Sequence, residues 1–201
     1  MTALPLRNSL ILALLIASLF VRCGEKIEGR FHISEAARRY QIDTTITAFS
    51  MIDNNGITDE FVLDKQVWYA THHYWQEWGV DGKAWGETYG VAYESTVNNW
   101  HFMMVLRADV DHTDLEIEWN LTDRVTVDLL SGAIESGNAR AVHFSDSMTV
   151  AGVTYYDIIE LDYTGKENLI GNSTPVKTFI SGRHGLVRME RKDGVVLSRV
   201  P

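Results

Sequence analysis

Residues 114–121 read Asp-Leu-Glu-Ile-Glu-Trp-Asn-Leu, with an apolar side chain at every second position. Because successive side chains of a β-strand point to opposite faces, this alternation predicts a strand with one face in the core and one in water. Val125, Val127 and Leu129 continue the pattern after a Thr-Asp pair. The stretch therefore predicts two neighbouring strands of a sheet.

Short β-rich runs recur on both sides of this stretch, separated by Asn, Asp and Gly. Residues 44–52 and 57–63 flank Asn54-Asn55-Gly56, which predicts a hairpin because both central residues of a type I′ turn need positive φ. Further predicted strands cover residues 88–95, 100–108, 139–144, 148–150, 153–163, 176–181, 186–191 and 195–200, the last two joined by Lys192-Asp193-Gly194. In residues 100–108 both alternating sets are largely apolar, which is typical of a strand covered on two faces.

The sequence thus predicts an all-β fold with about ten to twelve short strands and no alternating helix pattern. An antiparallel sandwich and a strongly curved, partly closed sheet both fit the pattern. Residues 67–78 are ambiguous because Val67, Thr71, Tyr74 and Trp78 also fall at helical spacing. We interpret them as a strand.

The first 23 residues have the pattern of a signal peptide, with Arg7 followed by an uncharged apolar run over residues 10–21. The run is too short to cross a bilayer, which takes about 20 residues. Cys23 directly after it predicts lipidation of the bacterial lipoprotein type, although Arg22 departs from the usual small residue at that position. Ordinary cleavage after Cys23 is the alternative, and both interpretations export the chain. We expect a polar tether over 24–40 and a single domain over 41–201.

Composition excludes several classes of function. The chain has 27 acidic and 18 basic residues, for a formal charge of −9, so it should repel nucleic acid. Cys23 is the single cysteine. A domain that starts after it has no disulfide, no thiolate zinc site and no cysteine nucleophile.

The C-terminal segment carries a resemblance. Met148-Thr-Val-Ala-Gly-Val-Thr-Tyr-Tyr-Asp157, then Gly185-Leu-Val-Arg-Met-Glu190 and Asp193-Gly194, resemble the end of many uncharacterised exported lipoproteins of the Bacteroidota. In these a "tVnGktYyDv" strand precedes a "GlVrlE…dG" hairpin. The resemblance covers roughly the last 55 residues together with the exported cysteine. It implies a β-rich lipoprotein domain at the outer membrane or cell surface, facing the periplasm or the exterior, and it brings no catalytic residue.

The segment from Trp68 to Tyr89 is dense in aromatic residues. Aromatic side chains pack well in cores and also stack on sugar rings. Core packing is the interpretation we favour, and a glycan-binding platform is the alternative. The platform would consist of Trp68, Tyr74, Trp75, Trp78, Trp85 and Tyr89.

Two segments carry metal-ligating residue types. His72 and His73, with Glu77, could serve a metal-dependent hydrolase, but adjacent residues of a strand point to opposite faces. Asp109-Val-Asp-His112-Thr-Asp114 has the oxygen-rich character of a calcium loop, and also the composition of an ordinary turn. For both segments we favour the interpretation that no metal and no cofactor binds.

No Gly-x-Ser-x-Gly motif and no glycine-rich phosphate loop is present in the sequence. We therefore predict a non-enzymatic binding or interaction module, attached to the membrane through a lipid on Cys23, with a glycan or an envelope protein as partner. The alternatives are a carbohydrate-binding accessory lipoprotein and a metal-dependent hydrolase. The sequence leaves the oligomeric state open.

Overall fold

The computed structural model describes residues 26–77, 80–109, 112–120, 123–165 and 175–201, and within these ranges it places all side chains except those of 26–28, 67–84 and 123. The described chain consists of strands and one single-turn helix, which confirms the all-β prediction. None of its helices is long and apolar enough to cross a bilayer. The elements are β1 (Lys26–Phe31), α2 (Glu35–Arg38), β2 (Ala48–Asp53), β3 (Thr58–Glu77), β4 (Val80–Ser95), β5 (His101–Ala108), β6 (Thr113–Trp119), β7 (Asp123–Asp128), β8 (Ile134–Gly137), β9 (Ala141–Val150), β10 (Val153–Asp162), β11 (Pro175–Ser181), β12 (Gly185–Arg191) and β13 (Val196–Arg199).

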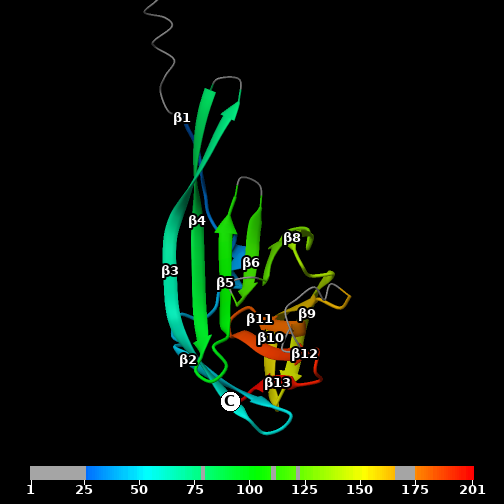
Figure 1. Ribbon diagram of the computed structural model, residues 1–201. Helices are drawn as coiled ribbons and strands as arrows, with labels where there is room; N and C mark the ends of the chain where they lie inside the picture. Colours follow the sequence, from blue (N-terminus) through cyan, green and yellow to red (C-terminus); the bar gives the residue numbers. More distant parts are fainter. Residues whose placement is uncertain (1–25, 78–79, 110–111, 121–122, 166–174) are drawn as a thin grey trace, which may run out of the picture.

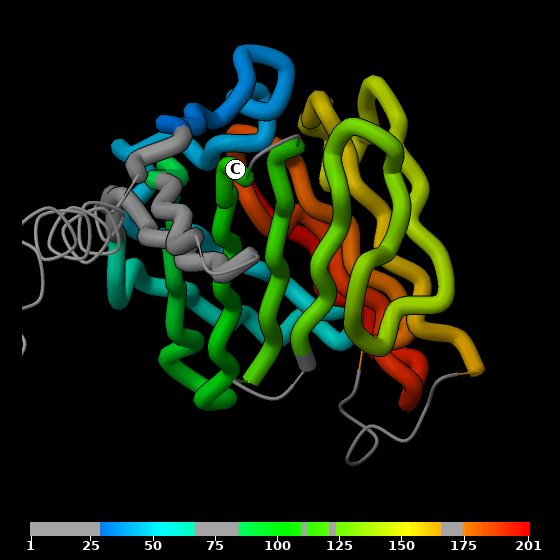
Figure 2. Tube along the Cα trace, turned by 90° about the horizontal axis from the view of Figure 1, so that it is seen from above, coloured from blue at the N-terminus to red at the C-terminus, as the bar shows by residue number. Residues whose placement is uncertain are grey.

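Twelve strands form one antiparallel sheet in the order β8-β7-β6-β5-β4-β3-β2-β13-β12-β11-β10-β9. From β2 to β8 and from β9 to β13, strands that follow one another in the chain are neighbours, and the pairing of β13 with β2 joins the two halves. The sheet curls so that the green strands face the orange and red strands across the interior (Figure 2). Its edge strands, β8 and β9, are consecutive in the chain, so the sheet is nearly closed. This confirms the predicted curved, partly closed sheet.

The core lies inside the curve and is built from alternating side chains of successive strands. Phe102, Met104 and Leu106 of β5 are at most 2% exposed, and Leu115 and Ile117 of β6 are fully buried beside them. Trp119, Val125 and Val127 continue this layer. The alternation that predicted the strands therefore also identified the inward face.

The outer face of β6 differs from the prediction. Glu116 and Glu118, expected in water, are only 5% and 4% exposed. The guanidinium of Arg124 on β7 covers them, with its Nη2 2.9 Å from Glu118 Oε2 and its Nε 3.4 Å from Glu116 Oε1. A cross-strand cation thus shields these carboxylates, which alternation alone does not indicate.

The hairpin at Asn54-Asn55-Gly56 forms between β2 and β3 as predicted, but its turn is of another type. Gly56 has φ +85°, whereas neither asparagine has positive φ. The loop has three residues with glycine in the left-handed position, and Asp53 Oδ1 accepts hydrogen bonds from the N–H groups of Asn55 and Ile57. The Asp53 side chain sets the turn where a type I′ geometry was expected.

Residues 67–77 belong to β3, as predicted, so the helical alternative is wrong. β3 and β4 form a hairpin that extends past the neighbouring strands (Figure 1). β1 lies parallel to β4, pairing Arg30 with Trp85 and Phe31 with Gly86.

The predicted tether is wrong for the part that the structure describes. Instead of extending away from the domain, the chain forms β1 and α2, and Ile33, Ala37 and Tyr40 are only 2–3% exposed. These residues are spaced four and three apart, so one helical turn brings their apolar side chains to one face. The segment is an integral part of the core.

Candidate functional site

Residues 31–43, here called the cap, lie across one end of the curved sheet. They contact strands and a turn from both halves of the sheet: the hydroxyl of Tyr89 on β4 donates to the carbonyl of Ile42 at 2.9 Å, and the Asp43 N–H donates to the carbonyl of Arg183 between β11 and β12. The ring of Tyr40 meets that of Phe144 on β9, edge to face, at 6.0 Å. The cap therefore closes this end of the interior.

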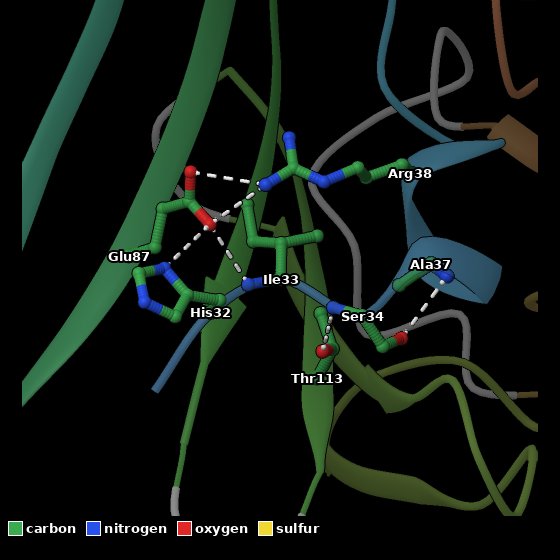
Figure 3. A network of polar contacts seen from close by, with 7 residues as sticks. All are labelled: His32, Ile33, Ser34, Ala37, Arg38, Glu87 and Thr113. Carbon is green, nitrogen blue, oxygen red and sulfur yellow. Dashed lines mark hydrogen bonds and ion pairs between the residues drawn. The ribbon is translucent and has the colours of Figure 1, made fainter. Parts of the chain in front are cut away.

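The cap is held to β4 mainly through Glu87 (Figure 3). Glu87 Oε2 accepts from the Ile33 N–H at 2.9 Å and from Arg38 Nη2 at 3.0 Å, while His32 Nδ1 lies 3.7 Å away. Ser34, which follows Ile33, makes two further contacts. Its N–H donates to Thr113 Oγ1 at 3.4 Å, and its Oγ accepts a hydrogen bond from the N–H of Ala37, which makes Ser34 the N-cap of α2. One carboxylate thus fixes both the strand end and the helical turn.

Close backbone contact fixes the other end of the cap. Gly182 lies against the cap so tightly that a Cβ on it would collide with the carbonyl oxygen of Arg39. Glycine is needed here because the two backbones touch. The cap sits in a fixed position on the sheet.

Beside the cap lies a half-open cavity of about 320 Å³, here called the cap cavity. This volume is within the range of small-ligand pockets, about 300 to 1,000 Å³. The lining combines apolar side chains with charged groups of both signs. It comprises Arg30, Phe31, His32, Ser34, Ala36, Ala37, Arg39 and Tyr40 from the cap side, and Asp109, His112, Thr113, Leu129 and Leu130 from the sheet.

On the sheet side of the cavity, Asp109, His112 and Asp114 bring their ligand atoms within 4.8 Å of one another. His112 Nε2 lies 3.1 Å from Asp114 Oδ1 and 3.5 Å from Glu135 Oε1 on β8. The first three residues come from the loop that the sequence marked as oxygen-rich, and the structure brings them together. Glu135 could not be found this way, because it lies on a strand that the sequence did not predict.

The electrostatics of this cluster are unfavourable for a buried carboxylate. The pKa of Asp114 is raised to about 6, chiefly by burial; His112 lowers it, and charge repulsion from Glu135, Asp109 and Asp128 adds to the increase. Asp114 is 7% exposed, and its buried Oδ1 forms no hydrogen bond with any described residue. The cluster therefore gathers three carboxylates around one imidazole.

A second hollow, of about 450 Å³, lies beside Tyr155, His184 and Arg199. Arg199 is 7% exposed, donates to the carbonyl of His184 and lies 4.3 Å from the centre of the Phe49 ring. These contacts assign Arg199 to packing.

Ser181 Oγ lies 3.3 Å from His184 Nδ1, a spacing that also occurs between a nucleophile and its base. However, Ser181 is fully buried and its hydroxyl donates to the carbonyl of Tyr156 at 2.9 Å. Its proton is directed away from the histidine. The pair does not have the geometry of an activated serine.

The predicted aromatic platform is only partly described. Tyr89 is 2% exposed and belongs to the core, so it cannot stack on a glycan. Trp85 is half-buried. Trp68, Tyr74, Trp75 and Trp78 lie outside the described side chains, and the platform that they would form stays a prediction.

The structure tests the predicted histidine metal site but not the predicted lipidation site. His72, His73 and Glu77 belong to the strand β3, whose backbone places Glu77 four residues, about 13 Å, from His73. That spacing is too long for a shared ion, so the helical version of this metal site is wrong. Cys23 lies outside the described residues, and its lipidation stays a prediction.

No protein-family model, no curated protein and no solved structure matches this chain. The resemblance to exported lipoproteins stays a prediction from the C-terminal motifs. The geometry of the cap cavity is therefore the basis for a functional proposal.

Proposed function

We propose that this chain is an exported, non-enzymatic binding module that holds a small ligand in the cap cavity. The observation that supports the proposal is the cavity itself: it measures about 320 Å³, borders the cap that Glu87 fixes, and is lined by apolar and charged groups together. Specific pockets commonly combine a largely apolar wall with a few polar groups that orient the ligand.

The lining indicates the kind of ligand. Phe31, Tyr40 and Leu129 offer apolar surface, and Arg30 and Arg39 lie on the cap side of the same cavity. A small amphipathic molecule with an anionic group would match both features. The leader over residues 1–23 supports export, and Cys23 would attach the module to a membrane.

Binding can be tested with the anionic dye 1-anilinonaphthalene-8-sulfonate and the purified full-length chain in mild detergent. We expect saturable, blue-shifted fluorescence that Ala36→Trp weakens at least tenfold, because Ala36 is an exposed residue of α2 that lines the cavity. Glu35→Trp places the same ring on the same helical turn outside the lining and should change the affinity less than twofold. Equal dye binding in Ala36→Trp and the parent chain would contradict the proposal.

Lipid attachment needs its own experiment. Cells that express the chain are grown on labelled palmitate, and label is measured on the parent chain and on Cys23→Ala. We expect the parent to carry label and the variant to carry none. Unlabelled parent chain would contradict membrane attachment but not ligand binding.

A further inference from the structure

We propose that Asp109, His112, Asp114 and Glu135 form a binding site for a divalent transition metal ion such as Zn²⁺. Two of the four residues, Asp109 and His112, also line the cap cavity. The site goes beyond the proposed function, because it depends on these four side chains and not on a small ligand.

The distances between the ligand atoms fit a single ion. Two ligands of a tetrahedral zinc ion with bonds of about 2.0 Å lie about 3.3 Å apart. His112 Nε2 lies 3.1 Å from Asp114 Oδ1 and 3.5 Å from Glu135 Oε1. An imidazole nitrogen therefore stands at ligand spacing from two carboxylates on different strands, and the Asp109 carboxylate lies within 4.8 Å of both His112 and Asp114.

The burial of Asp114 supplies a second reason to expect a cation. This residue is 7% exposed, and its buried Oδ1 accepts no hydrogen bond from the described chain, although His112 Nε2 lies 3.1 Å from it. A buried carboxylate oxygen of this kind is costly unless a donor or a cation faces it. Among the described residues, neither Asp114 nor Glu135 forms an ion pair with a cation other than His112.

The ligand set also selects the kind of metal. The sequence alone favours calcium, if any metal, because it shows a loop rich in aspartates. In the structure a histidine nitrogen is at the centre of the cluster, and imidazole suits zinc and other transition metals better than calcium. We therefore expect the site to prefer Zn²⁺ over Ca²⁺.

The site is connected to the cap. Thr113, between two of the ligands in sequence, faces the N–H of Ser34 through its hydroxyl. An ion that fixes residues 112–114 would also fix this contact. Zinc should consequently slow amide exchange at Ser34 as well as in the loop.

The test is calorimetric titration of Zn²⁺ and Ca²⁺ into the full-length chain, without a polyhistidine tag and after treatment with a chelator. We expect one Zn²⁺ per chain, with the affinity at least tenfold lower in His112→Gln and in Asp114→Asn. His143→Gln is the matched control, because His143 is an exposed histidine on β9 away from the cluster. It should leave the affinity unchanged.

Two further measurements separate loss of the site from loss of the fold. Glu135→Gln changes a residue whose side chain is 40% exposed, and should lower zinc affinity several-fold with an unchanged circular dichroism spectrum. Co²⁺ added to the parent chain should give the visible absorption of a four-coordinate ion, which His112→Gln abolishes. The proposal is overturned if no Zn²⁺ binds, if His112→Gln binds it as tightly as the parent, or if Ca²⁺ is preferred.

Discussion

Asp59 and Asp114 are both buried aspartates of this sheet, and their surroundings differ. Asp59 is 2% exposed and accepts hydrogen bonds from Ser95 Oγ at 2.7 Å, Asn98 Nδ2 at 2.7 Å and the Val97 N–H at 3.3 Å. Asp114 has an oxygen without such a donor and lies near other carboxylates.

The difference separates a structural carboxylate from a candidate ligand. At Asp59 the donors come from the turn between β4 and β5, so the carboxylate holds that turn in place. At Asp114 the nearest groups are a histidine and further carboxylates. Carboxylates close together repel one another and so destabilise the fold, whereas they attract a bound cation. Substitutions at the two positions should therefore have opposite effects on stability.

The largest effect is expected from Asp59→Ala, which leaves three donors without their acceptor. We expect the free energy of unfolding to fall by about 3 kcal/mol, measured by urea denaturation. Asp64→Ala, at an exposed position of the same strand, serves as the control and should cost less than about 0.5 kcal/mol. A loss at Asp59 no larger than at Asp64 would remove the distinction.

Glu87→Ala tests a second donor-satisfied carboxylate, at the same end of the sheet as Asp114. Loss of the bonds from the Ile33 N–H and from Arg38 should destabilise the cap by about 2 kcal/mol. Hydrogen exchange at residues 33–40 should accelerate accordingly, while β11 and β12 keep their protection. Glu94→Ala, exposed on the same strand, is the control. Unchanged exchange in the cap would show that Glu87 does not hold it.

The sequence predicted the sheet well, because alternation directly reports which side chains face a common interior. It identified β6, which spans Thr113–Trp119, and the hairpin at Gly56, and Leu115 and Ile117 are indeed buried. The way in which the two halves join into one sheet could not be predicted, since the pairing of β13 with β2 joins residues far apart in the chain.

The cap and the metal-ligand cluster were harder to predict. Ile33, Ala37 and Tyr40 are three apolar residues in a polar, charged segment, and their spacing becomes informative only when the curved sheet leaves an end to cover. Three members of the cluster are close in sequence and were noticed together. Glu135 joins them through β8, a four-residue strand with no clear alternation.

Asp114→Asn should have the opposite effect to Asp59→Ala. With the pKa of Asp114 raised to about 6 in the folded chain, the native state binds more protons than the unfolded state between about pH 4 and 6. Its ionisation above that window therefore destabilises the chain. In the presence of a chelator we expect Asp114→Asn to be more stable than the parent by about 1 kcal/mol at pH 7.5, with the difference vanishing near pH 4.

Denaturation of both chains across this pH range measures the difference directly, and the chelator keeps metal binding out of the comparison. If the advantage of Asp114→Asn grew as the pH fell, the carboxylate would be stabilised in the fold. In that case Asp114 would resemble Asp59, and the contrast between them would fail.

The smallest expected effect is that of Glu135→Gln on the ionisation of Asp114. Glu135 raises the pKa of Asp114 by charge repulsion, but its side chain is 40% exposed, so water screens much of the interaction. Removing this charge should lower the pKa of Asp114 slightly and change stability by less than about 0.5 kcal/mol. Carbon-detected NMR of the labelled carboxyl group measures the titration, with Glu94→Gln as the distant control. A pKa that rises or stays constant would show that Glu135 does not act on Asp114, and the cluster would then lack the like-charge repulsion that sets it apart from the site at Asp59.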